Sequence, residues 1–355
     1  MNSIIKKIIV FFCFSIIIFG AEHQVSILPK VVVVTTGGTI AMKYDKASGG
    51  VVPAVSGKDL MAAVPGLEKI AVIQTVEFCN IDSSQMTPEV WRKLGEKVQT
   101  ILELSDVEGV VVTHGTDTMT EGAFFLETIL KSKKPVVFVG AMRSASDLSP
   151  DGPANIYNAV LQICSPESKN WGVTITMNQF INSARHVYKG ETTNVQTFTS
   201  GEYGYLGYIV GKRVIKLNDI RSKTKLNLPK TLPKVPLFAT YAGDDGKYIR
   251  NAVDDGVKGI VLEGVGAGNV NKAVYQAIEY ALSKKIPVVV ASRVINGGVY
   301  ALYGDKGGGS SLIKIGAYLS GDLSAYKARL LLMIALSQPD MTEEKLKILF
   351  SHSDY

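Results

Sequence analysis

The stretch that decides the fold is Val31-Val32-Val33-Val34-Thr35-Thr36-Gly37-Gly38-Thr39. Its β-branched start is typical of a strand buried on both faces, and the glycine pair predicts a tight turn at the carboxyl end of that strand. Outward from this stretch, further strands are predicted at 109–113, 135–139 and 172–177, and helices at 87–104, 117–131 and 152–163. This alternation predicts an α/β fold with right-handed crossovers and a mostly parallel, doubly wound sheet that is covered on both faces.

A second set of strands and helices follows residue 235, with strands predicted at 235–240, 259–263 and 287–291. The segment before it is rich in lysine, arginine and proline and is typical of an exposed linker. At 355 residues, two domains are the expected arrangement. The predicted organisation is a signal peptide (1–20), a larger N-terminal domain (28–212), a linker (213–234) and a smaller C-terminal α/β domain (235–355).

The composition excludes several classes of protein. Hydrophobic residues make up 46% of the chain and charged residues 20%, which excludes a disordered, collagen-like or coiled-coil protein. The net charge of +6 comes from scattered basic residues, so no nucleic-acid partner is expected. The three cysteines are too few for a disulfide scaffold or a Cys-rich zinc site, and the four histidines show no ligand spacing, so we expect no metal site.

The first twenty residues have the pattern of a secretory signal. Lys6 and Lys7 precede an apolar run at residues 8–19, and Gly20-Ala21 supplies the small residues of a cleavage site. The run is shorter than the roughly 20 residues that a membrane span needs. We therefore expect a periplasmic protein whose mature form has no membrane anchor. Its two remaining cysteines, Cys79 and Cys164, are expected to be buried free thiols.

Polar residues follow four of the predicted strands. Open parallel sheets bind ligands outside the carboxyl ends of their strands, so these residues are the candidates for a site. The four sets are Thr36-Gly37-Gly38-Thr39-Ile40, Asn80-Ile81-Asp82-Ser83-Ser84, Thr113-His114-Gly115-Thr116-Asp117-Thr118 and Gly140-Ala141-Met142-Arg143. A site with hydroxyl groups and one carboxylate is suited to a neutral nucleophile and to a small zwitterionic ligand. The glycines expose backbone N–H groups that can stabilise an oxyanion. Taken singly, each element has a simpler interpretation as a turn, a cap or a helix-start acid.

Two other functions fit part of the sequence. The run Gly264-Val265-Gly266-Ala267-Gly268-Asn269 is similar to a dinucleotide fingerprint, but its sixth position is Asn and it lies in the second domain. A periplasmic amino-acid binding protein would also have two α/β domains and a signal sequence. A binding protein of this kind would need no nucleophile.

The segments Thr36-Gly37-Gly38-Thr39-Ile40-Ala41 and Thr113-His114-Gly115-Thr116-Asp117-Thr118-Met119 resemble the two signature segments of the bacterial L-asparaginase family. The resemblance continues through 134–143, 149–160, 264–269, 292–294 and 327–329 and so covers nearly the whole mature chain. The predicted signal sequence indicates the secreted, type II branch. The alternative within this family is a glutaminase-asparaginase with substantial activity on L-glutamine.

The resemblance implies that the side-chain amide of L-asparagine is hydrolysed to L-aspartate and ammonia through a covalent acyl-enzyme, without metal or cofactor. Thr39 matches the family's nucleophile, and Thr116 matches a second threonine on the opposite side of the scissile amide. Lys189 matches the lysine beside that threonine, where a base would need burial and a nearby charge to lower its pKa. Spacing alone favours a surface lysine in a hairpin at position 189.

Further matches concern substrate binding. Asp117 matches the carboxylate that holds the substrate's ammonium, and Ser83 the hydroxyl that holds its α-carboxylate. The N–H groups of Thr39 and Thr116 would face the oxyanion, and the Ala141 carbonyl would receive the amide NH₂.

Some positions depart from the family's pattern. Gly50 stands near the place of the tyrosine that assists the nucleophile, and Tyr44 is the nearest tyrosine. Ser84 stands where a substrate-binding glutamine is usual. Asn269 matches an asparagine that reaches a neighbouring subunit's site, although it could equally be a helix N-cap, and no glutamate matches the family's cross-subunit acid. The family's shared sites imply a homotetramer, a dimer of intimate dimers.

Overall fold

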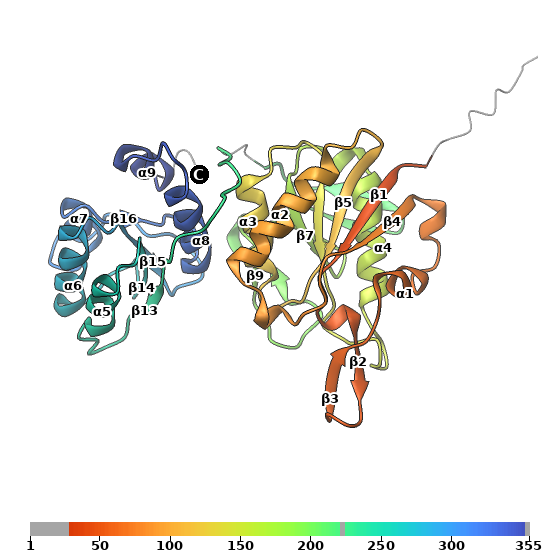
Figure 1. Ribbon diagram of the computed structural model, residues 1–355, viewed down its shortest axis with the longest axis horizontal. Helices are drawn as coiled ribbons and strands as arrows, with labels where there is room; N and C mark the ends of the chain where they lie inside the picture. The colour runs from red at the N-terminus through yellow and green to blue at the C-terminus, as the bar shows by residue number, and fades with distance from the viewer. Residues whose placement is uncertain (1–27, 221–223, 352–355) are drawn as a thin grey trace, which may run out of the picture.

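The computed structural model describes residues 28–220 and 224–351, and the predicted signal peptide lies outside these residues. The described chain forms two α/β domains side by side (Figure 1). The first domain carries strands β1 to β12 and the second carries β13 to β16. The predicted fold class, two α/β domains of unequal size, is confirmed.

The first domain is built on an eight-stranded sheet in the order β12-β11-β8-β7-β6-β5-β1-β4. The strands are β1 (Lys30–Thr35), β4 (Val72–Glu77), β5 (Val107–Thr113), β6 (Val136–Val139), β7 (Val173–Met177), β8 (Phe180–Ser183), β11 (Gly207–Val210) and β12 (Arg213–Lys216). Strands β4, β1, β5, β6 and β7 are parallel, whereas β8, β11 and β12 form an antiparallel edge. Residues 213–216, which we predicted as linker, therefore belong to the sheet.

Four helices cover this sheet: α1 (Gly57–Ala62), α2 (Pro88–Leu102), α3 (Met119–Ile129) and α4 (Gly152–Cys164). Helix α2 begins where the sequence indicates, because the Thr87 hydroxyl caps it and Pro88 occupies its first position. It buries Trp91, Leu94 and Val98 on one face. The valines of β1 are almost completely buried, as their sequence predicts.

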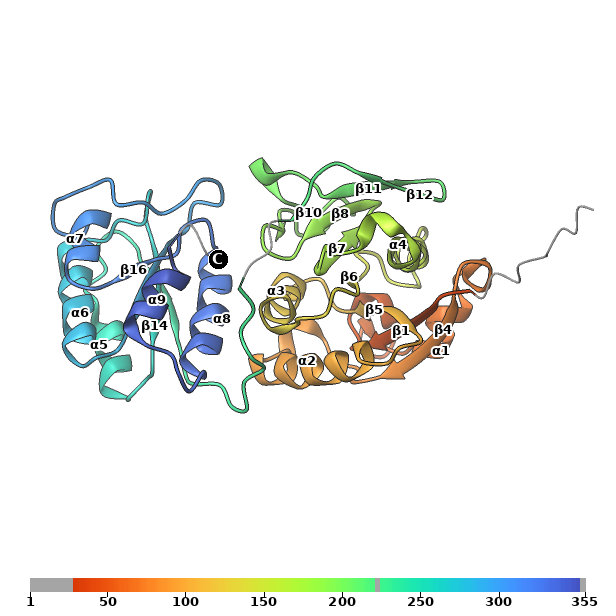
Figure 2. The same cartoon turned by 90° about the horizontal axis from the view of Figure 1, so that it is seen from above.

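The expectation of right-handed crossovers throughout is wrong. Gln162 of α4 is hydrogen-bonded to the hydroxyls of Thr174 and Thr176 on β7, whereas Val173 lines a pocket together with Phe124 of α3. Successive residues of a strand point to opposite faces, so α3 and α4 lie on opposite faces of the sheet (Figure 2). The chain steps in the same direction from β5 to β6 to β7, and one of these two crossovers must therefore be left-handed.

Two antiparallel ribbons lie outside the large sheet. The hairpin of β2 (Met42–Asp45) and β3 (Gly50–Pro53) follows the first threonine loop and projects from the body of the domain (Figure 1). The short pair of β9 (Tyr188–Lys189) and β10 (Phe198–Thr199) carries the candidate lysine.

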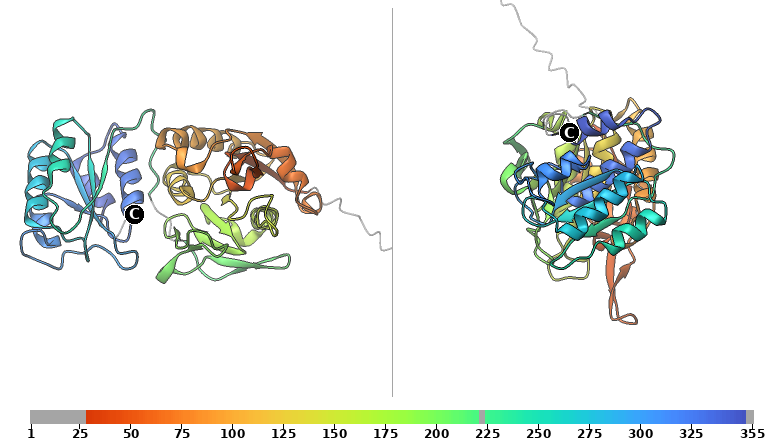
Figure 3. Two further views of the ribbon diagram at one scale, coloured as in Figure 1. Left: turned by 90° about the horizontal axis from the view of Figure 1, so that it is seen from below. Right: turned by 90° about the vertical axis from the view of Figure 1, so that its left-hand side faces the viewer.

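The second domain is a four-stranded parallel sheet in the order β13-β14-β15-β16. Its strands are β13 (Leu237–Ala239), β14 (Ile260–Gly264), β15 (Val288–Ser292) and β16 (Tyr318–Leu319), and its helices are α5 (Lys247–Asp254), α6 (Lys272–Ser283), α7 (Gly309–Lys314), α8 (Ala325–Leu336) and α9 (Glu343–Leu349). Helix α8 lies between this sheet and the first domain (Figures 2 and 3). Because it packs on both sides, α8 is buried nearly all round.

Candidate active site

Two loops meet at the carboxyl ends of β1 and β5 through a pair of glycines. Gly38 has a φ of 84°, and a Cβ atom built on it would lie 2.3 Å from the Cα of Gly115. Only glycine permits this approach, because any side chain at position 38 would push the loops apart. Thr39 and Thr116 directly follow these glycines, so the contact brings the two threonine loops together.

Lys189 joins the second threonine loop from the β9 strand. Its Nζ lies 3.0 Å from Thr116 Oγ1 and 2.7 Å from Asp117 Oδ1, and its side chain is 20% exposed. Lys189 does lie in an antiparallel strand pair, as the hairpin interpretation expected, but its ammonium is bonded to Thr116 and Asp117. Oδ1 of Asp117 accepts a hydrogen bond from Lys189, whereas Oδ2 of Asp117 has no hydrogen-bond partner among the described residues.

Ser83 ties the loop after β4 to the same place. It is buried at the start of a short 3₁₀ helix, Ser83–Gln85. Its Oγ accepts the N–H of Asp117 at 3.2 Å, and its carbonyl accepts the Thr118 hydroxyl at 2.8 Å. The structure thus brings Ser83, Thr116, Asp117 and Lys189 into one connected group.

The first threonine presents polar groups that are not engaged. Among residues 28–220 and 224–351, none is hydrogen-bonded to the Thr39 hydroxyl, and none accepts the N–H of Thr39 or of Thr116. Thr116 is buried and Thr39 half-buried. Backbone N–H groups of this kind normally find an acceptor, so a hydroxyl and two donors are left for a ligand at this point.

A buried histidine links the second threonine loop to helix α2 by hydrogen bonds. The Trp91 indole N–H donates to His114 Nε2 at 3.2 Å, and His114 Nδ1 lies 2.7 Å from the carbonyl of Gly115. These partners suit the neutral ring with its proton on Nδ1. Burial lowers the pKa of His114 to about 4, so the ring is neutral at physiological pH.

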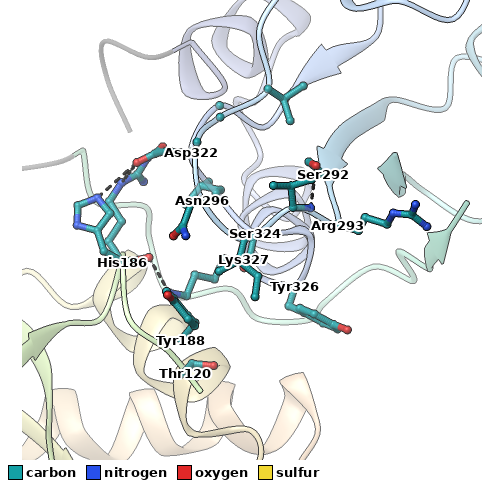
Figure 4. Close-up of a pocket in the computed structure, with 18 of the residues that line it drawn as sticks. Thr120, His186, Tyr188, Ser292, Arg293, Asn296, Asp322, Ser324, Tyr326 and Lys327 are labelled. Atoms are coloured by element: carbon teal, nitrogen blue, oxygen red, sulfur yellow. Dashed lines mark hydrogen bonds and ion pairs between the residues drawn. The ribbon is translucent and has the colours of Figure 1, made fainter. Parts of the chain in front are cut away.

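A cleft of about 730 Å³ is lined by residues of both domains (Figure 4). Asp117 and Lys189 are among its lining residues. The second domain lines it with Ser292, Arg293 and Lys327. Thr39, Thr116 and Ser83 are not among its lining residues, so the cleft adjoins the threonine loops rather than containing them.

Lys327 of α8 is a buried residue of this region to which the sequence analysis gave no role beyond its place in the family resemblance. Its Nζ donates to the carbonyls of Arg185 at 2.6 Å and Val187 at 2.7 Å, in the segment that leads to Lys189. Burial lowers the pKa of Lys327 to about 7. A lysine inside the apolar run of residues 325–336 was the signal, because a buried charge requires partners.

A second link between the domains lies beside it. The Arg185 guanidinium and His186 Nε2 both contact the carboxylate of Asp322, the latter at 3.4 Å. Burial alone would raise the pKa of Asp322, but His186 and Arg185 outweigh it and hold that pKa well below its usual range. The His186 ring also stacks on Tyr203 at 4.0 Å between centroids.

Tyr44, Ser84 and Asn269, three further candidate residues, have no bond to the connected group. Tyr44 is on the projecting hairpin with its side chain 56% exposed, and only its backbone N–H is bonded, to Ser146 Oγ. Ser84 is exposed, and its N–H is bonded to Asp82 Oδ1. Asn269 lies in the second domain, and its Oδ1 is buried without a partner among the described residues. The interpretation of Asn269 as a helix N-cap is wrong, because Asn271 caps α6.

Cys79 and Cys164 are free and half-buried, and burial raises the pKa of each thiol to about 11. Within residues 28–220 and 224–351, no three His, Cys, Asp or Glu side chains are grouped as metal ligands. No helix in that part of the chain is long and apolar enough to span a membrane.

Comparison with known proteins identifies two family regions. Residues 30–221 match the family described as "Asparaginase, N-terminal", and residues 234–350 match the "Glutaminase/Asparaginase C-terminal domain".

Individual relatives cover nearly the whole chain. "L-asparaginase 2" of Escherichia coli is 39% identical over 91% of this chain and 93% of that protein. "Probable L-asparaginase periplasmic" of Haemophilus influenzae is 39% identical over 88% and 89% of the two chains. A crystal structure of a probable cytoplasmic L-asparaginase from Campylobacter jejuni superposes with a TM-score of 0.83 at 39% identity, covering 91% of this chain and 99% of that one.

Proposed function

The chain belongs to the asparaginase family, and from that premise and the geometry of the threonine loops we propose that it hydrolyses the side-chain amide of L-asparagine to L-aspartate and ammonia through a Thr39 acyl-enzyme. It is an amidohydrolase, as its named relatives are. Family membership does not favour the binding-protein and dinucleotide interpretations, which leave the threonines without a role.

In the first step, the Thr39 Oγ1 forms a bond to the amide carbon and the carbonyl oxygen becomes an oxyanion. The free N–H groups of Thr39 and Thr116 would donate to that oxygen, which is the usual way to stabilise such an intermediate. The carbon–nitrogen bond then breaks, and the threonine proton ends on the departing ammonia. Water cleaves the resulting ester to give aspartate and restores the hydroxyl.

The connected group around Asp117 binds the amino acid and places its amide. Oδ2 of Asp117 would accept the substrate's ammonium, while the Ser83 hydroxyl, whose oxygen already accepts the Asp117 N–H, would donate to the α-carboxylate. Because the Ser83 loop and the Thr116 loop are bonded to each other, the substrate's two charges would be held at a fixed distance from the nucleophile. Ser84 contributes to the same subsite from the rim.

Thr116 and Lys189 would act on the side of the substrate's amide that lies opposite Thr39. Since the Lys189 Nζ donates to Thr116 Oγ1, the Thr116 proton can be directed at the reacting group. Tyr44 would assist Thr39 after the hairpin closes over the site, and Asn269 would complete a site in another subunit.

The observation that carries this proposal is the unengaged hydroxyl of Thr39 beside two unengaged N–H donors. We expect Thr39→Ala to abolish ammonia release from asparagine while retaining aspartate binding by calorimetry. Thr39→Ser should keep part of the activity, and Thr100→Ala on the exposed side of α2 should keep all of it. Equal turnover by wild type and Thr39→Ala would overturn the assignment.

The oligomer we propose is a homotetramer. An exposed apolar loop of the second domain, adjoining the cleft, supports it; its exposed members are Val294, Ile295, Tyr300, Leu302 and Tyr303. Such a patch is typical of a surface that is covered by another chain. Light scattering of the purified protein tests this, and a monomer at micromolar concentration would contradict it.

The location we propose is the periplasm. The basic start, the apolar run of residues 8–19 and the small residues that follow support export. N-terminal sequencing of the protein from a periplasmic extract should begin just after residue 20 or 21, and an intact Met1 on cytoplasmic protein would contradict export.

A further inference from the structure

Asp151 lies at the N-terminus of α4 but does not cap that helix. Ser56, Thr87 and Asn271 use their side chains to cap their own helices, whereas Asp151 makes no such bond. Its carboxylate instead binds the loop after β6. Both of its oxygens lie 3.1 Å from the N–H nitrogen of Met142, and Oδ1 also accepts the N–H of Arg143 at 2.9 Å.

Asn155, one turn further along α4, holds the peptide on the other side of Ala141. Its Nδ2 donates to the carbonyl of Gly140 at 3.0 Å and to Asp151 Oδ2 at 3.0 Å. Its Oδ1 accepts the N–H of Asn178 at 3.0 Å. Asn155 is itself buried, so the residues before and after Ala141 are both fixed by α4.

This arrangement determines the direction of the Ala141 carbonyl. In a trans peptide the C=O and N–H point in opposite directions, and no cis peptide occurs among the described residues. Since the Met142 N–H points at Asp151, the Ala141 C=O points away from it. Ala141 is 1% exposed, yet none of the described residues donates a hydrogen bond to that carbonyl. A buried carbonyl without a partner is uncommon and indicates a site for a ligand's donor.

The Ala141 carbonyl lies at the same edge of the sheet as Thr116, where β5 and β6 end. Gly140 packs against the Thr116 loop, where a Cβ atom on Gly140 would lie 2.6 Å from the His114 carbonyl oxygen and 3.3 Å from Thr116 Cγ2. A substrate amide beside Thr116 is therefore within reach of the segment 140–142.

We propose that Asp151 is a positioning residue for the departing amide nitrogen, acting through the Ala141–Met142 peptide. The inference rests on the proposed function. A carboxylate that accepts the peptide N–H polarises the peptide and strengthens its carbonyl as an acceptor. The amide nitrogen becomes a better donor as it gains a proton and leaves, so this contact is stronger in the transition state than with bound substrate and raises kcat.

The test compares two leaving groups. Asparagine releases ammonia, whose N–H groups can donate to the Ala141 carbonyl, whereas L-aspartate β-methyl ester releases methanol from an ester oxygen that has no N–H. We expect Asp151→Asn to lower kcat/KM for asparagine by about 10-fold to 100-fold and to change kcat/KM for the ester by less than about threefold, with the loss for asparagine in kcat rather than KM.

The matched control is Asp147→Asn, an acid of the same loop that accepts the N–H of Ser144 and does not bind the Ala141–Met142 peptide. It should leave both substrates unchanged. If Asp151→Asn does not fold, Asp151→Ser provides the same comparison, because serine can cap α4 and carries no charge.

Equal losses for the amide and the ester would overturn the assignment and leave Asp151 a structural residue. An unchanged amide activity in a folded Asp151→Asn protein would overturn it too. Wild-type protein that cleaves neither compound would instead overturn the proposed function, so the two failures are distinguishable.

Discussion

The two threonine loops are held very differently. The loop with Thr116 is bonded to Lys189, to Ser83 and, through His114, to Trp91, so its side chains have defined partners before any ligand binds. The loop with Thr39 contacts its neighbour through Gly38 and then continues into the exposed hairpin that carries Tyr44.

This difference indicates that the two loops have different functions in the reaction. The groups on the Thr116 loop are already ordered in the folded protein, so they need no further ordering when the transition state forms. The side that must admit the substrate remains open, and ordering it requires the ligand or a hairpin movement. Four measurements test whether the two loops differ in this way.

The largest effect is expected at Lys189. Lys189→Met removes the partner of Thr116 Oγ1 and of Asp117, and kcat should fall about 10³-fold. Stopped assays of ammonia release measure this loss. Lys212→Met, an exposed lysine beyond β11, is the control and should be fully active. A Lys189→Met protein with more than about a tenth of wild-type kcat would mean that the ordered loop does not need its lysine.

Lys327→Met should have the next largest effect, on stability. It leaves the carbonyls of Arg185 and Val187 without their donor, and we expect the free energy of unfolding to fall by about 3 kcal/mol. Urea denaturation measures the change, with Lys345→Met, a half-exposed lysine of the same domain, as the control. An unchanged midpoint would show that α8 does not hold the segment leading to Lys189.

A smaller loss is expected at the open loop. Tyr44→Phe should lower kcat about 10-fold to 100-fold, because only the phenol group that assists Thr39 is removed. The melting temperature should stay the same, since this side chain is exposed. Tyr248→Phe, an exposed tyrosine of the second domain, should change neither quantity. Full activity of Tyr44→Phe would assign the role to another group.

The smallest effect concerns pH and the ordered loop. His114 has a folded-state pKa of about 4, below its ordinary value near 6.5, so between these pH values the unfolded chain binds a proton that the folded chain does not. Stability must then fall as the pH drops through this window, by about 2 kcal/mol between pH 6.5 and 5.

His114→Gln should lose this part of the pH dependence in urea titrations. His186, whose pKa burial also lowers, is present in both proteins, so their difference reports His114. Parallel pH profiles for the two proteins would contradict a neutral His114.

Much of the fold could be predicted from local patterns. The valine run of β1, the Thr87-Pro88 start of α2 and the parallel strands each have a signal within a few residues. The antiparallel edge of β8, β11 and β12 could not be predicted in this way, because its strands are short and part of it lies in a Lys- and Arg-rich stretch. The left-handed crossover was missed for a different reason, since handedness depends on which face a helix finally packs against.

The site was predictable in its residue types but not in its bonds. The positions of Ser83, Thr116 and Asp117 follow from their places after parallel strands, and the structure brings them together. Lys189 lies 72 residues from Asp117, and its contact could be inferred only from a family resemblance. Asp151 lies within residues 149–160 of that resemblance, yet nothing in the sequence indicates its bonds to the loop after β6, because an acid before a helix is ordinarily a cap.

Local sequence patterns were enough to predict most strands and helices, the edge of the sheet where polar groups collect, and the glycine turn after the first strand. These are local properties, set by side-chain branching, periodicity and the steric freedom of single residues. Only the tertiary structure decided that Lys189 reaches Thr116, that Lys327 of the second domain holds the segment before it, and that the Ala141 carbonyl is left without a donor. The two lysine contacts join residues far apart in the chain, and such contacts depend on how whole elements pack.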